Sequence, residues 1–165
     1  MLWPYILQVF VAAMAMTFDP IEDFRGDLSE QLYPTGAINA LIMVESCGQE
    51  SSQRSKFYGL LQMSPIYLTE IGLKPEDVMS RFGAIAAFYI MQRRYRVRRK
   101  GTSELAIPIF HKSGPRTWKR WRRLVSQGYS DMEAVRMLKK PGLERFLRKY
   151  FAARSGNAKW CGEVK

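Results

Sequence analysis

The stretch TGAINALIMVESCG, residues 35–48, combines an apolar helical stripe with a carboxyl group at its end. Thr35 is a suitable N-cap residue, and apolar side chains then recur at the spacing of one helical face. These side chains belong to Ile38, Leu41 and Ile42. Because Glu45 continues the same face, the pattern predicts a helix from Thr35 to about Ser46 that carries a glutamate beside apolar neighbours at its C-terminal end.

A second stretch, GLLQMSP at residues 59–65, follows a polar segment and ends in a helix start. Ser64 is a favoured N-cap residue, and Pro65 fits the first helical position, where its missing N–H is not needed. The pattern predicts a short helix that ends at Gly72.

The rest of the chain alternates helical patterns with turn residues, which predicts an all-α fold. From about Arg81 a helix is expected to bury one stripe and then to run into a basic, solvated end at residues 93–100. The stripe consists of Phe82, Ile85, Ala86 and Tyr89. Ser103 can cap the next helix, but Pro108 would remove a hydrogen bond from a helix interior, so that helix is predicted to be kinked or to begin later.

Three helical patterns follow towards the C-terminus. One face of residues 117–127 is apolar, and it is formed by Trp118, Trp121, Leu124 and Val125. Ser130 and Glu133 have the spacing of a capping box, which predicts another helix start. A last helix is expected after residues 141–142, a Pro-Gly pair, and should reach about Ala153.

The order of these motifs resembles the core signature of the soluble lytic transglycosylase (Slt) family. That signature is Glu-Ser at a helix end, matched at residues 45–46, followed by Gly-Leu-x-Gln, matched at residues 59–62, and a helix-starting proline, matched by Pro65. The segment GAIAAFY at residues 83–89 corresponds to the family helix that follows the active-site cleft. The resemblance covers about residues 32–125.

A third family motif, Ala-Tyr-Asn-x-Gly-Pro, is matched only in part by FHKSGP at residues 110–115. The Gly-Pro pair is present and the Tyr-Asn pair is absent, so the substrate contacts of that pair are in doubt. His111, the single histidine of the chain, stands in this motif. We expect it to be a polar residue of the cleft or surface rather than of the core.

The resemblance implies a single lysozyme-like helical domain of the goose type that cleaves peptidoglycan without metal or cofactor. It implies that Glu45 is the single catalytic acid/base, that Ser46 orients the muramoyl sugar and that Gln62 lines the sugar cleft. The alternative for Ser46 and Gln62 is that they satisfy helix termini. Met63 and Tyr89 are candidates for the cleft wall, although such side chains more often pack in a core.

The chemistry needs a carboxyl group that remains protonated near neutral pH, because a proton must reach the leaving glycosidic oxygen. Burial among apolar side chains should raise the pKa of Glu45. Most glycosidases use a second carboxylate, but neither Glu50, Glu70, Glu76 nor Asp77 is a convincing candidate. The family mechanism that the resemblance implies needs none, since the 6-hydroxyl of N-acetylmuramic acid attacks its own anomeric carbon.

Composition indicates one folded domain with a basic surface. The chain has 165 residues, 47% of them hydrophobic, and a formal net charge of +11. Basic residues concentrate at 93–100, 116–123 and 139–149, which indicates a polyanionic partner: nucleic acid, an anionic membrane surface or the bacterial wall. Contact through residues 93–100 and 116–123 is the expectation. Aromatic residues interleave with these charges, a pattern that suits base stacking, but tryptophans facing inward on an amphipathic helix are the simpler interpretation.

The two cysteines, Cys47 and Cys161, match no metal-binding spacing. Two free thiols are the favoured interpretation, and a disulfide is the main alternative, because bond geometry cannot be read from sequence.

Residues 1–20 contain an apolar run without basic residues that is too short for a confident membrane-spanning helix. A packed or partner-binding helix, an export segment and a membrane anchor all remain open for it. Residues 21–165 are expected to form the catalytic domain. The small size and the altered third motif favour a bacteriophage virion or lysis enzyme acting in the host periplasm. The alternatives are a conjugation or secretion-system transglycosylase in the bacterial periplasm or at the inner membrane, and a structural virion (ejection) protein with little activity.

Overall fold

A computed structural model describes residues 36–49, 53–54, 56–97 and 102–161. These residues are mostly helical, with one two-stranded antiparallel hairpin, so the all-α prediction is confirmed. In chain order the elements are α2 (Ala37–Ser46), β1 (Gln53–Arg54), β2 (Phe57–Tyr58), α3 (Pro65–Glu70), the 3-10 helix η3 (Pro75–Val78), α4 (Arg81–Arg94), α5 (Ala106–Ser126), α6 (Asp131–Met137), α7 (Leu143–Arg154) and the 3-10 helix η4 (Lys159–Cys161).

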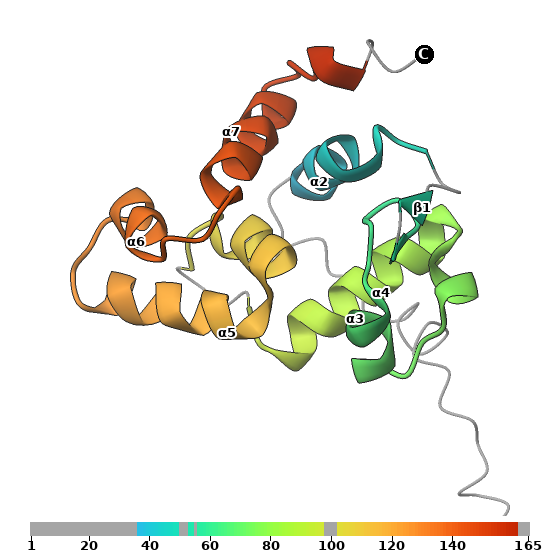
Figure 1. The fold of residues 1–165 in the computed structure, drawn as a ribbon, viewed down its shortest axis with the longest axis horizontal. Coiled ribbons are helices and arrows are strands. Elements are labelled where there is room, and N and C mark those ends of the chain that lie inside the picture. The colour runs from blue at the N-terminus through green and yellow to red at the C-terminus, as the bar shows by residue number, and fades with distance from the viewer. Residues whose placement is uncertain (1–35, 50–52, 55, 98–101, 162–165) are drawn as a thin grey trace, which may run out of the picture.

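Helix α2 packs against α7, and α5 packs against both α6 and α7 (Figure 1). The hairpin, α3 and η3 lie together with α4 on the other side of α2 (Figure 1). One core joins the helices. Its largest fully buried side chains are Trp118, Trp121, Tyr150, Phe88 and Phe110. Full burial of each such side chain stabilises the fold by roughly 1.5–3 kcal/mol.

Most of the predicted helix starts are confirmed. The Ser64 side chain accepts a hydrogen bond from the backbone N–H of Tyr67 at 3.3 Å, with Pro65 following at the first helical position. Ser130 and Glu133 form the predicted capping box. Hydrogen bonds from Ser130 hold the pKa of Glu133 below its usual value.

The predicted cap of α2 is wrong. Gly36 occupies the N-cap position with φ 82° and ψ −5°, and it provides no side chain for capping. Thr35 itself lies outside the described residues. The C-terminal end of the helix at Ser46 agrees with the sequence pattern.

The buried stripe of α4 also differs from the prediction. Phe82 is 40% exposed, and Ile85 and Tyr89 are only half-buried, whereas Ala86 is buried as expected. The buried face is formed mainly by Gly83, Ala84, Ala87, Phe88 and Met91. Gly83 determines this orientation, because a Cβ there would lie 1.8 Å from the carbonyl oxygen of Asp77 in η3. Close backbone contact therefore outweighs the apolar pattern.

Helix α5 begins later than Ser103, which was one of the two predicted alternatives. Pro108 lies in its first turn, where a missing N–H leaves no helical hydrogen bond unmade. The helix is kinked further on, at Gly114, whose φ of 75° and ψ of 177° are non-helical. Trp118 and Trp121 beyond the kink are buried, as predicted.

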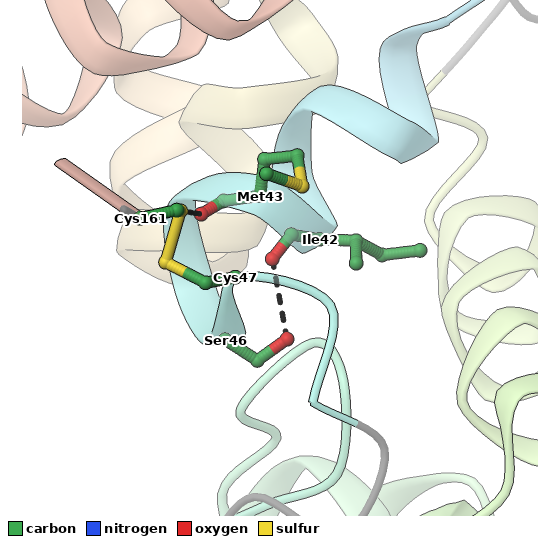
Figure 2. Close-up of a disulfide and its surroundings, with 5 residues drawn as sticks. All are labelled: Ile42, Met43, Ser46, Cys47 and Cys161. Atoms are coloured by element: carbon green, nitrogen blue, oxygen red, sulfur yellow. Dashed lines mark hydrogen bonds between the residues drawn. A yellow bond between two sulfur atoms is a disulfide. The ribbon is translucent and has the colours of Figure 1, made fainter. Parts of the chain in front are cut away.

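The two cysteines form a disulfide, so the prediction of two free thiols is wrong (Figure 2). Their Cα atoms lie 5.4 Å apart although the residues are separated by 114 positions in the sequence. Packing of α7 against α2 brings η4 alongside the end of α2. Cys161 Sγ also lies 3.3 Å from the carbonyl oxygen of Met43. This is a van der Waals contact and not a hydrogen bond, because a disulfide sulfur carries no proton.

Polar side-chain contacts also connect α7 to the segment before α5. Arg154 Nε lies 2.8 Å from Glu104 Oε1, and its Nη2 donates to Oε2 at 3.0 Å, which gives the two-point geometry that favours arginine–carboxylate pairs. The Tyr150 hydroxyl donates to the same carboxylate at 3.0 Å.

No helix within the described ranges is both long and apolar enough to cross a bilayer. The apolar segment at residues 1–20 lies outside those ranges, and its proposed partner or membrane contacts stay predictions.

Candidate active site

Glu45 lies in the last turn of α2, and its side chain is only 13% exposed. The buried residues Leu41 and Ile42 precede it on the helix. After Ser46 the chain turns at Cys47, which has a left-handed backbone with φ 53°. An apolar helix end therefore holds a carboxyl group that is largely shielded from solvent.

Two residues of α5 face this carboxyl group. His111 Nε2 lies 3.4 Å from Glu45 Oε1, and Lys112 Nζ lies 3.8 Å from the same oxygen. The His111 side chain is 5% exposed, whereas that of Lys112 is 43% exposed and lies over the Phe146 ring at 4.9 Å. The site therefore joins an acid from α2 to an imidazole and an ammonium group from α5.

The kink in α5 ends the helical segment that carries these two residues. Gly114 has φ 75° and ψ 177°, a backbone region that is essentially limited to glycine. Pro115 then starts the second segment with its φ already suited to a helix. The Gly-Pro pair thus separates the turn that faces Glu45 from the outer, basic part of α5.

Substitution of Gly114 by alanine should destabilise the protein by roughly 1–3 kcal/mol, because alanine cannot adopt this backbone conformation without strain. The midpoint of urea unfolding measures the loss. Gly142→Ala is the matched control, since Gly142 has a left-handed backbone with φ 77° and ψ −10° that other residues can adopt at lower cost. Equal losses in both variants would contradict a special role for the kink.

Ser46 is fully buried, and its hydroxyl donates to the carbonyl oxygen of Ile42 at 3.2 Å (Figure 2). This hydrogen bond satisfies the buried hydroxyl within its own helix, by bonding back to the preceding turn, so in the structure the side chain has a local role at the helix terminus. Contact of Ser46 with a muramoyl sugar stays a prediction.

Gln62 follows the hairpin in a left-handed conformation with φ 47°, and its Nε2 donates to the carbonyl oxygen of Gly59 at 2.8 Å. Met63 is buried and forms an antiparallel bridge with Tyr58. Tyr89 is half-buried and packs edge-on against Phe88. Their proposed contacts with substrate stay predictions, and the burial of Met63 agrees with core packing.

Other acids of the described segments have structural contacts or face solvent. Glu70 accepts a hydrogen bond from the Tyr95 hydroxyl, which raises the pKa of that tyrosine. Asp77 caps η3, and Asp131 pairs with the Ser103 hydroxyl. Glu76 and Glu144 are exposed. Within these segments no group of three or more His, Cys, Asp and Glu side chains is arranged to hold a metal ion.

The basic part of α5 presents its charges outward. Arg116, Lys119, Arg120, Arg122 and Arg123 are all exposed. Trp118 and Trp121 are 1% and 2% exposed, so the inward-facing interpretation of these rings is confirmed. At the other basic segment, Arg93 and Arg94 are exposed at the end of α4, and residues 98–100 lie outside the described ranges.

Sequence reasoning missed Lys112 as a neighbour of Glu45. It also assigned His111 only a general cleft or surface role. The one signal that could have indicated both was their place in FHKSGP, the partial match to the third motif at residues 110–115.

Comparisons with known protein families, curated proteins and solved structures found no match to this chain. Assignment of a function therefore depends on the chemistry of the residues around Glu45.

Proposed function

We propose that this protein is a peptidoglycan lytic transglycosylase with Glu45 as its acid/base. The observation that carries the proposal is a glutamate, 13% exposed, at the end of an apolar helix with an imidazole 3.4 Å away. A carboxyl group shielded from water can hold its proton near neutral pH, as a general acid must. The motif order from residue 45 to Pro65 adds the substrate class through its resemblance to the Slt family.

In the proposed reaction, the protonated Glu45 donates to the oxygen that links N-acetylmuramic acid to N-acetylglucosamine, and the C1–O bond breaks. The resulting carboxylate removes the proton from the 6-hydroxyl of the muramoyl sugar. That oxygen bonds to C1, giving a 1,6-anhydro ring, and Glu45 recovers its proton. No water is consumed, and one carboxyl group serves both steps.

Among the residues that the structure describes, the contacts of the other acids support a mechanism with one carboxyl group; Glu50 lies outside these residues. Most hydrolytic glycosidases use a second carboxylate across the scissile bond, roughly 5–10 Å from the first. In the described part of the chain, Glu70, Glu104 and Asp131 pair with side chains other than that of Glu45.

The disulfide between Cys47 and Cys161 supports a place of action in an oxidising compartment, such as the periplasm. A bacteriophage virion enzyme that acts on the wall in the host periplasm is the setting that we propose. The basic segments at the end of α4 and on α5 would attract the protein to anionic surfaces. A conjugation or secretion-system enzyme is the alternative in the same compartment.

Digestion of peptidoglycan sacculi should release 1,6-anhydromuropeptides, which mass spectrometry distinguishes from reducing ends by the loss of one water. Reducing ends as the main product would contradict the transglycosylase route and indicate hydrolysis. A sample inactivated by Glu45→Gln is the control for contaminating host enzymes.

A structural virion protein with a lysozyme-like fold and little activity is the second candidate. Lys112 favours it, because a cation 3.8 Å from Glu45 stabilises the ionised carboxylate rather than the protonated acid. This candidate predicts that sacculi incubated with the protein yield no new muropeptides at any pH.

A further inference from the structure

We propose that His111 is a positioning residue that shares a proton with Glu45, so that the acid/base operates as a Glu45–His111 pair. The inference deepens the proposed function and rests on it. It goes beyond the sequence resemblance, in which the corresponding family motif contains a Tyr-Asn pair and no histidine.

The geometry of His111 favours a dedicated partner over a general polar residue. Its Nε2 faces Glu45 Oε1 at 3.4 Å, while its Nδ1 is buried with no hydrogen-bond partner. The Phe88 ring packs against the imidazole at a centroid distance of 6.0 Å. With its side chain 5% exposed and one ring nitrogen 3.4 Å from Glu45 Oε1, His111 is placed to act on that carboxyl group.

This pair suits both halves of the proposed reaction. When Glu45 has given up its proton, the carboxylate can accept a hydrogen bond from the Nε2–H of His111. When Glu45 is protonated, its hydroxyl can donate to the Nε2 lone pair of the other tautomer. The imidazole therefore orients the same carboxyl oxygen in both protonation states without a change of position.

The neighbouring groups on α5, α2 and η4 differ from His111 in exposure or in chemistry. Lys112 approaches from α5 but is 43% exposed, so solvent screens its charge. Ser46 on α2 directs its hydroxyl to the Ile42 carbonyl. The disulfide that η4 contributes does not titrate. Of these groups, His111 combines a buried side chain with an imidazole nitrogen that can either donate or accept a hydrogen bond.

Two substitutions of His111 separate the roles of shape and hydrogen bonding. Phenylalanine keeps a ring against Phe88 but removes both nitrogens, and it should reduce kcat on soluble glycan strands by roughly 10²-fold through a misplaced acid. Glutamine offers an amide in reach of Glu45 and should restore much of this loss. Lys112→Met is the comparison for loss of a nearby cation, with a smaller expected effect because the ammonium group is exposed.

The pH profile gives the readout that a merely structural histidine would not change. A group that donates a hydrogen bond to a carboxylate, or carries positive charge beside it, favours the ionised acid. Without that group Glu45 keeps its proton to higher pH, so the basic limb of the kcat/KM profile should move to higher pH in His111→Phe. An unchanged profile together with an unchanged kcat would overturn the proposal.

A double-mutant cycle in unfolding experiments tests the pairing without any enzyme assay. His111→Phe and Glu45→Gln, alone and combined, should shift the urea midpoint non-additively at neutral pH. If the cycle shows coupling but sacculi are not cleaved, the proposed function fails while the pair stands. If sacculi are cleaved but the shifts are additive and the pH profile is unchanged, the pair fails while the function stands.

Discussion

Glu45→Gln should lower the rate of peptidoglycan cleavage by about 10²- to 10⁴-fold or more. Glutamine keeps the shape of the side chain but can neither deliver a proton to the glycosidic oxygen nor remove one from the 6-hydroxyl. The residual rate would reflect substrate binding alone. Muropeptide release from sacculi, followed by chromatography, measures the loss.

Glu76→Gln is the matched control, since Glu76 is exposed on η3 and should be dispensable. Both variants should retain the helical circular-dichroism spectrum of the parent protein. Near-normal turnover in Glu45→Gln would exclude Glu45 as the acid/base. A loss in both variants would indicate a general effect on folding.

Cys161→Ser should reduce the free energy of unfolding by about 4 kcal/mol. The disulfide closes a loop of 114 positions, and the chain-entropy model gives a stabilisation near 4–5 kcal/mol for a loop of that size. Observed losses on removal of native disulfides usually lie at roughly 2–5 kcal/mol. Urea unfolding of the oxidised parent and the variant, followed by circular dichroism, measures the difference.

The reductant provides the control for this prediction. Reduction should bring the parent protein down to the stability of the variant, and it should leave Cys161→Ser unchanged. Cys47→Ser should lose as much as Cys161→Ser, and the double variant should lose no more than either. Equal stability of the parent and Cys161→Ser under oxidising conditions would contradict a structural disulfide.

The helices were predictable because their signals are local. Ser64 precedes Pro65, and Ser130 stands three residues before Glu133. Each serine marks a helix start, because its side chain accepts a hydrogen bond from a backbone N–H of the first turn. The inward face of α5 was also visible from the spacing of Trp118 and Trp121. That these helices adopt a lysozyme-like arrangement stays a prediction.

Features that depend on distant segments were not predictable. The disulfide requires α7 to lie against α2, which no local pattern encodes. The exposure of Phe82 results from the close contact of Gly83 with the Asp77 carbonyl, which a hydrophobicity pattern cannot show. Both features depend on tertiary contacts that local sequence patterns do not encode.

Only part of the candidate site was predictable, because some of its residues come together through contacts between distant segments. Glu45 follows from its own helix and from the motif order, so its partly shielded position agrees with the expectation. His111 and Lys112 reach it from another helix, and the kink at Gly114 that ends their segment depends on a backbone angle rather than on a side-chain pattern.

The cross-link between Cys47 and Cys161 also limits how the chain can travel. A protein closed into a covalent ring cannot enter a narrow channel in single file, because two strands must pass abreast at every point of the ring. Unfolding alone does not remove this obstacle. If the protein crosses a membrane or a phage tail through such a channel, the two thiols must be free during passage and must join on the far side, so that transport and completion of the stable fold occur in a fixed order.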